Sequence, residues 1–306
     1  MTFWNEYFDD ISEDLGQRNI QCVMWGPSSS AASSGVWMLT GDMTGKRIHR
    51  SIDGAVTFEE ISLASNGADG NALSIDAGRD IQSIASDGLG NWMFGQESRL
   101  YSSTNDGKDW TKSTPWGSGG TPGQIRGFQY TNSSWVVIYS RSNAIYARSC
   151  AEDDITDWGT EFQPSVTYQK SGNDVTRNPL NPDNTIEKRA SCASAEGRVV
   201  FATTNDKGIY HFDVNGKTIT TGSAAGGVYF DSDGDYQGVS GWTDANTFQD
   251  LATDGTTWVA TTKNGDVYKS IDRGETWTHV VDGFSDSNVA NTDDWYAVTC
   301  DVTLPL

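Results

Sequence analysis

Residues 80–113 read DIQSIASDGLGNWMFGQESRLYSSTNDGKDWTKS, and this stretch decides the fold. It contains four short runs rich in apolar residues, separated by three tight turns, two of which contain Asp-Gly. Short runs with period-two alternation predict β-strands, and tight turns between them predict that the strands pair as hairpins. Residues 80–113 are therefore predicted to form one four-stranded antiparallel sheet.

The same order of strands recurs along the chain. Four further copies occupy residues 20–62, 124–162, 187–221 and 247–281. A sixth copy begins at residues 295–300, and residues 2–8 resemble the outer strand of the other copies. Repeated four-stranded units that cannot bury both faces alone stack radially. We therefore predict an all-β fold, a β-propeller of five or six four-stranded blades. Residues 1–306 are predicted to form one domain, and pairing of the N-terminal strand into the last blade would explain both fragments.

Three turns between third and fourth strands share a sequence pattern. Residues 270–277 read SIDRGETW, residues 103–110 read STNDGKDW and residues 51–58 read SIDGAVTF. The Asp or Asn is expected to accept backbone N–H groups, the Gly to take a positive φ, and the aromatic ring to pack between blades. The predicted structural residues of these turns are Asp53, Asn105, Gly107, Trp110, Asp272, Gly274 and Trp277.

The pattern Ser-x-Asp-x-Gly-x-Thr-Trp, which residues 270–277 match throughout, resembles the Asp-box of the BNR-repeat propellers. That family includes sialidases, photosystem assembly factors and many proteins of tailed bacteriophages. A sialidase uses three arginines, a Tyr activated by Glu and an acidic Asp. No motif here carries these residues across, and the nearest fragment to the family's Arg-Ile-Pro is residues 46–49. His49, His211 and His279 fall in predicted outer-half strands and are expected to be structural.

Composition limits the partners. The chain has 41 acidic and 21 basic residues and a net charge of -20. Such a chain is repelled by nucleic acid and by anionic membranes, so neither nucleic-acid binding nor membrane insertion is expected. Residues 1–10 lack the basic and apolar regions of a secretory signal, so we expect synthesis in the cytoplasm. The four cysteines form no C-x-x-C pair and are expected to be free thiols: Cys22, Cys150, Cys192 and Cys300.

The first strand of each copy places a long polar side chain near its start. In a propeller the first strands are innermost, so these side chains are predicted to ring one mouth of the channel. Amide, guanidinium and phenol groups there suit a polyhydroxylated or carboxylated ligand, and a solvated channel lining is the alternative. The predicted ligand-binding residues are Gln21, Gln82, Arg126, Arg189, Gln249 and Tyr296.

Three long connections are predicted on the same face of the propeller: residues 63–79, 163–186 and 222–246. They carry aromatic side chains suited to sugar stacking or protein contact: Tyr168, Tyr229, Tyr236 and Trp242. In the last connection, the alternating carboxylates of Asp231, Asp233 and Asp235 resemble a calcium loop without the distal Glu of an EF-hand. Calcium is the one candidate cofactor, and a solvated acidic turn is the alternative.

The leading hypothesis is a non-enzymatic propeller of a phage virion. Placed on the tail, fibre or capsid, it would contact other virion proteins or a surface glycan. Release by lysis would reconcile a composition typical of extracellular binding proteins with the missing export signal. Two alternatives stay open: a glycan-cleaving enzyme, either a sialidase-like hydrolase or a lyase, and a cytoplasmic assembly factor.

Overall fold

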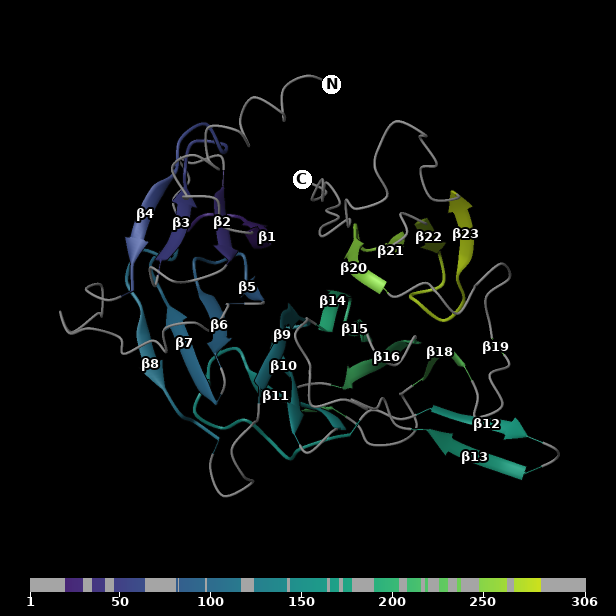
Figure 1. Cartoon of the computed structure of the whole chain (residues 1–306). Coiled ribbons are helices and arrows are strands. Elements are labelled where there is room, and N and C mark those ends of the chain that lie inside the picture. The colour runs from purple at the N-terminus through teal and green to yellow at the C-terminus, as the bar shows by residue number, and fades with distance from the viewer. Residues whose placement is uncertain are drawn as a thin grey trace.

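The computed structural model is an all-β propeller (Figure 1). The structure describes residues 20–29, 35–41, 47–63, 81, 83–96, 98–116, 124–141, 144–163, 166–170, 173–177, 190–203, 208–215, 218–219, 226–230, 236–237, 248–262 and 267–281. The predicted sixth copy and the N-terminal segment lie outside these residues.

Five blades follow one another along the chain. Blade 1 contains β1 (Ile20–Gly26), β2 (Val36–Gly41), β3 (Arg47–Ser51) and β4 (Glu59–Ser62). Blade 2 contains β5 (Ile84–Ser86), β6 (Trp92–Gln96), β7 (Arg99–Ser103) and β8 (Thr111–Ser113). Blade 3 contains β9 (Gln124–Thr131), β10 (Ser134–Arg141) and β11 (Ala144–Ala151). Blade 4 contains β14 (Ala190–Ala195), β15 (Arg198–Thr203), β16 (Gly208–Asn215), β17 (Thr218–Ile219), β18 (Gly226–Phe230) and β19 (Tyr236–Gln237). Blade 5 contains β20 (Phe248–Thr253), β21 (Trp258–Thr262), β22 (Val267–Ser270) and β23 (Thr278–Val281).

The first strands of the blades are innermost, as predicted. Successive first strands contact one another in the order β1, β5, β9, β14 and β20. Figure 1 shows these strands around the centre and the fourth strands β4, β8 and β23 at the periphery. Pairing within each blade is antiparallel. The first strands begin at the same end of the ring. Any interruption of strand pairing near these starts therefore lies on one face of the propeller.

Each pair of successive blades encloses its own apolar cluster. One cluster joins blades 1 and 2, another blades 2 and 3, a third blades 3 and 4, and a fourth blades 4 and 5. Four blades have a Trp in the second strand. Each Trp pairs with the last residue of the third strand or, in blade 3, with the residue before it. These residues are Trp37, Trp92, Trp135 and Trp258. Trp92, Trp135 and Trp258 are buried and Trp37 is half-buried, so this repeated residue supplies much of the area that the short strands bury.

The outer parts of blades 3 and 4 differ from the prediction. The predicted fourth strand of blade 3, residues 157–162, forms a single bridge between Ala147 and Phe162. In blade 4, the described part of the predicted fourth strand at residues 218–221 is β17, which pairs with the end of β16. The fourth-strand position beside Ile209–His211 is taken by β18. Since β18 lies within residues 222–246, that connection is partly sheet.

The connection predicted over residues 163–186 also contains strands. It holds a hairpin of β12 (Val166–Lys170) and β13 (Asn173–Arg177), with Tyr168 in β12. Tyr229 lies in β18 and Tyr236 in β19, whereas Trp242 lies outside the described residues. Residues 64–79 of the first connection also lie outside them.

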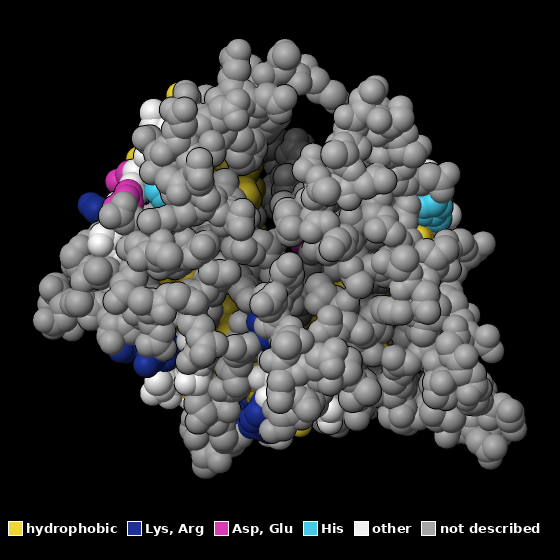
Figure 2. Space-filling model, viewed as in Figure 1, with side chains coloured by type: hydrophobic (Ala, Val, Ile, Leu, Met, Phe, Trp, Pro, Cys, Tyr) yellow, Lys and Arg dark blue, Asp and Glu magenta, His cyan; other side chains and the backbone are white. Residues whose placement is uncertain are grey.

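Most large apolar side chains of the described residues are buried. The exposed ones stand mainly at turns: Ile52, Val56, Leu89, Ile271 and Val280. Among the side chains that Figure 2 colours, the hydrophobic ones on the viewed face are small separate spots. Within the described part of the chain, no helix has the length and apolarity needed to span a membrane. Cys22, Cys150 and Cys192 are free thiols, and Cys300 lies outside that part.

Candidate functional site

The three predicted turns share one hydrogen-bond scheme. The Oγ of the first residue accepts the N–H of the fifth, in the pairs Ser51–Ala55, Ser103–Gly107 and Ser270–Gly274, at 3.0, 3.0 and 2.9 Å. The carboxylate or amide oxygen of the third residue accepts the N–H of the seventh, in the pairs Asp53–Thr57, Asn105–Asp109 and Asp272–Thr276, each at 2.9 Å. The predicted roles of Asp53, Asn105 and Asp272 in these turns are confirmed. We call these segments the serine-anchored turns.

These contacts favour the ionised carboxylates. Hydrogen bonds from the Thr57 hydroxyl and N–H, and then from Ser51, lower the pKa of Asp53 to about 2. Burial alone would raise the pKa of Asp272, but bonds from Thr276 and Ser270 lower it. Both carboxylates are therefore ionised at neutral pH and act as turn staples.

Two of the turns are pressed onto the preceding blade. Gly107 has a φ of 75° and Gly274 a φ of 84°, as the sequence predicted. Trp110 lies in the cluster between blades 1 and 2, and Trp277 in the cluster between blades 4 and 5. Their indole N–H groups donate to Gly107 O at 2.9 Å and to Gly274 O at 3.1 Å. These two turns thus pack between neighbouring blades and hold them together.

Blade 3 contains a degenerate fourth turn that was not predicted from the sequence. Trp158 Nε1 donates to Ile155 O at 2.9 Å, as Trp110 and Trp277 do in their turns. Cys150 pairs with Trp135 as Ser103 pairs with Trp92. Cys150 lies eight residues before Trp158, whereas Ser103 lies seven residues before Trp110, so this turn is one residue longer. Asp153 and Trp158, spaced like Asn105 and Trp110, are the signal that could have found it.

Three of the predicted ligand-binding residues sit at β-bulges. The pairing register shifts between Ile20 and Cys22 in β1, between Ile125 and Gly127 in β9, and between Phe248 and Asp250 in β20. The bulged residues are Gln21, Arg126 and Gln249. All three bulges lie at the start of an innermost strand, and hence at the same end of the ring.

Arg126 is buried, with 3% of its surface exposed. Its Nε donates to Ser140 Oγ on the neighbouring strand β10 at 3.3 Å. This contact fixes the plane of the guanidinium group at the start of the blade. Arg126 is therefore a positioned group at this end of the ring.

The bulge is not repeated in the described part of blade 4. β14 pairs without interruption from Ala190 to Ala195, so its described residues contain no bulge equivalent to that of Arg126. Arg189, which comes just before this strand, lies outside the described residues. Gln82 and Tyr296 also lie outside them. Their ligand-binding roles remain predictions.

The predicted calcium residues also lie outside the described part of the chain: Asp231, Asp233 and Asp235. Among the described residues, no group of three His, Cys, Asp or Glu side chains is placed to hold a metal ion.

Blade 3 contains a buried cluster of Tyr, Glu and Arg. The Tyr139 hydroxyl donates to Glu161 Oε2 at 2.5 Å, and Arg148 Nε donates to the Tyr139 hydroxyl at 3.1 Å. Glu161 also pairs with Arg141, whose guanidinium lies 4.8 Å from the ring centroid of Tyr146. Burial first, and then the bond to Glu161, raise the pKa of Tyr139. The buried hydroxyl stays protonated.

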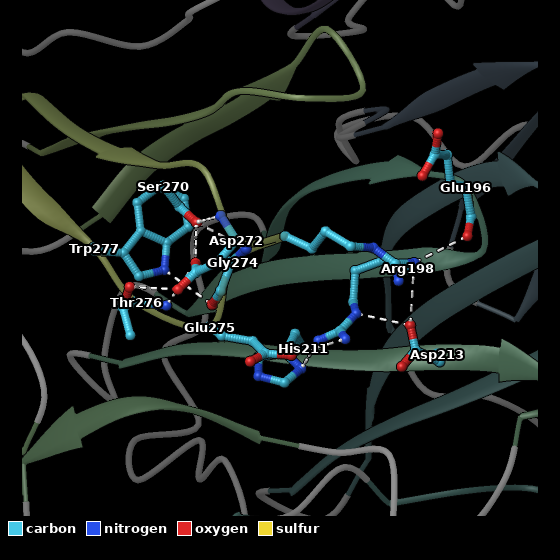
Figure 3. Close-up of polar contacts among 11 residues, drawn as sticks. Glu196, Arg198, His211, Asp213, Ser270, Asp272, Gly274, Glu275, Thr276 and Trp277 are labelled. Carbon is cyan, nitrogen blue, oxygen red and sulfur yellow. Dashed lines mark hydrogen bonds and ion pairs between the residues drawn. The ribbon is translucent and has the colours of Figure 1, made fainter.

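A second charged cluster joins blade 4 to the turn of blade 5 (Figure 3). The buried Arg198 donates from Nε to Asp213 Oδ1 at 2.7 Å and from Nη2 to Glu275 Oε1 at 3.3 Å. Its Nη1 bonds to His211 Nδ1. Burial and the adjacent Arg198 cation lower the pKa of His211 to about 4. His211 is therefore neutral at pH 7, as a hydrogen-bond acceptor for an arginine must be.

No family model matches the chain, and no curated protein matches it. Among solved structures, "YCF48 bound to D1 peptide" is 16% identical over 87% of each chain, with a TM-score of 0.42. "YCF48 from Cyanidioschyzon merolae" is 15% identical over 85% of this chain and 86% of that chain, with a TM-score of 0.40. The propeller assignment rests on the strand pairing and blade order described above.

Proposed function

We propose that this chain is a non-catalytic binding propeller whose ligand contacts lie where the innermost strands begin. The repeated bulge carries this proposal. A bulge breaks the alternation of a strand and re-aims a side chain, and bulges are common beside functional sites. Here the same irregularity recurs in three blades and each time carries a long polar residue: Gln21, Arg126 and Gln249.

The residue types indicate a polar ligand. Amide groups both donate and accept hydrogen bonds, and a guanidinium recognises carboxylates and carbonyls. Because Arg126 is 3% exposed, it would contact a ligand only at the accessible edge of its side chain. The hydroxyl and carboxyl groups of a glycan, or the carbonyls of an extended peptide, match this set. Tight binding of nucleic acid does not fit a net charge of -20.

A glycan-cleaving function is the second candidate, and the two Tyr–Glu pairs of blade 3 speak against it. A Tyr nucleophile needs a hydroxyl that ionises readily and is open to substrate. Tyr139 is fully buried and its pKa is raised. Burial and a hydrogen bond to Glu152 likewise raise the pKa of Tyr130 to about 12. Both Tyr–Glu pairs therefore suit a structural role.

As the biological setting we propose the virion of a tailed phage, supported by the sequence resemblance alone. The module would contact other virion proteins or a surface glycan. A cytoplasmic assembly factor is the third candidate. Mass spectrometry of purified particles tests the setting, and absence of the protein from them would reject it.

The binding site is tested on an array of sialylated and bacterial glycans together with immobilised particle proteins. Gln21→Ala, Arg126→Gln and Gln249→Ala should each weaken binding about tenfold, the effect of losing one good polar contact. Lys112→Ala and Thr278→Ala, on exposed outer-strand positions, should bind like the wild type. Unchanged binding by the triple bulge variant would reject the site. Turnover of sialosides that disappears in Arg126→Gln would replace binding with catalysis.

A further inference from the structure

Two serine-anchored turns keep a side chain where glycine would be favoured. The fourth residue of the turn is Asp106 in blade 2 and Arg273 in blade 5, with φ of 58° and 63°. The same position in blade 1 is Gly54, with a φ of 79°. A left-handed backbone is unfavourable for a residue with a Cβ, and more so for Arg than for Asp. Strain of this kind persists only where surrounding contacts compensate for it.

For Asp106 the compensating contacts are on blade 1. Its Oδ2 accepts from Ser28 Oγ at 3.0 Å and from Ser29 Oγ at 2.8 Å, and its Oδ1 accepts from Ser29 N at 3.0 Å. Arg50, on β3 of the same blade, donates from Nε to Asp106 O at 2.6 Å. Asp106 is buried, so blade 1 presents a donor-rich socket that fits an acidic side chain.

For Arg273 the contacts are on blade 4 and have the opposite character. Its Nη2 donates to Glu196 O at 3.0 Å and lies 3.5 Å from Asp213 Oδ1. Glu196 belongs to the turn between the first and second strands of blade 4, as Ser29 does in blade 1. Blade 4 therefore presents an acceptor-rich socket at the equivalent place, and this socket fits a basic side chain.

We propose that the fourth residue of the serine-anchored turn specifies which blade packs against which. The apolar clusters discriminate poorly, because both turns bring a Trp and a Gly against a second strand. Charge does discriminate. Blade 2 docked on blade 4 would set Asp106 against Asp213 and the Glu196 carbonyl, and it would set Lys108, in the place of Glu275, beside Arg198. Blade 5 docked on blade 1 would set Arg273 beside Arg50. Such like-charge contacts select against wrong partners among similar surfaces.

The test compares loss of the contact with reversal of its charge. Asp106→Asn and Arg273→Gln remove the charge, whereas Asp106→Arg and Arg273→Asp reverse it. The double reversal makes both wrong dockings complementary and both correct ones repulsive. Each variant is unfolded in urea and refolded by dilution, and the yield of monomer with native hydrogen-exchange protection of β6 and β21 is measured.

The neutral variants should refold with at least about half the wild-type yield, and each reversal should lower the yield about tenfold. The two sites lie in different blade pairs, so their effects on equilibrium stability should be additive. The yield of the double reversal should fall below the product of the single yields, because misassembly is then favoured. Equal losses of yield in the neutral and the reversed variants would overturn the proposal. A double reversal whose yield equals the product of the two single yields would also overturn it. If the reversals give no native monomer, reversal yields that recover under refolding at high salt support it, and unchanged yields oppose it.

Discussion

A Cβ atom built on Gly107 would lie 1.7 Å from Cε of Met38, on the second strand of the preceding blade. The same relationship joins Gly274 to Val200 Cγ2, at 2.6 Å. Gly255 also has a positive φ, of 95°, but a Cβ there would meet nothing within 4 Å. Gly255 is thus required only by the backbone conformation of its turn, whereas Gly107 and Gly274 also lie where two blades approach closely.

We therefore expect three alanine variants to differ in stability. Gly255→Ala should lower the free energy of unfolding by about 1–2 kcal/mol, the cost of a left-handed alanine. Gly274→Ala should lose about 1–3 kcal/mol more, because it also overpacks the blade interface against the stiff side chain of Val200. Gly107→Ala should lose less than Gly274→Ala, because the flexible end of Met38 can move aside. Urea unfolding measures all three. A loss in Gly274→Ala no larger than in Gly255→Ala would show that the interface yields freely.

The hydroxyl of Thr57 should control the ionisation of Asp53. Thr57→Val removes the largest contribution to the low pKa, so the midpoint should rise from about 2 toward 3.8. Carboxyl NMR titration measures it, and Thr276→Val should shift Asp272 in the same direction. Because the folded-state pKa is depressed, the stability contributed by Asp53 is complete above about pH 4 and is lost as the pH falls toward 2. A midpoint unchanged by Thr57→Val would contradict this account.

His211 should make the protein sensitive to mild acid. Its pKa is about 4 in the folded state, against an ordinary value of 6.5, so the unfolded chain binds the proton more readily. Stability should be highest above pH 6.5 and should fall by up to about 3 kcal/mol as the pH drops toward 4. His211→Gln should show a smaller loss over this window in urea unfolding at several pH values. An identical slope in wild type and variant would refute the assignment.

Trp110 and Trp258 provide a matched pair for the indole hydrogen bond. Both are fully buried, but Trp110 Nε1 donates to Gly107 O, whereas Trp258 Nε1 has no partner among the described residues. Trp110→Phe should destabilise the protein by about 1 kcal/mol more than Trp258→Phe, because it leaves the Gly107 carbonyl without its donor. Thermal and urea unfolding measure the difference. Equal losses would mean that ring volume alone matters.

The sequence predicted what depends on local pattern and missed what depends on pairing. The quartets of blades 1, 2 and 5 follow from alternation and turn residues, as the SIDRGETW turn of residues 270–277 illustrates. In blade 4, residues 218–221 and 226–230 both have strand-like composition, and only pairing with Ile209–His211 places the second as the outer strand. The bulges at Gln21, Arg126 and Gln249 were also beyond local reasoning, because a bulge is defined by the partner strand.

Among the described residues, several arginines are buried while several carboxylates are exposed. Arg50, Arg126, Arg148 and Arg198 are each less than one-tenth exposed, while Asp53, Glu59, Glu60 and Glu275 are exposed on blade rims. The positive charge of these four arginines thus lies inside the blades. At contact distance, an approaching molecule meets more negative charge than the composition alone suggests. Encounters with cationic surfaces should consequently be fast in dilute buffer and slow markedly as ionic strength rises.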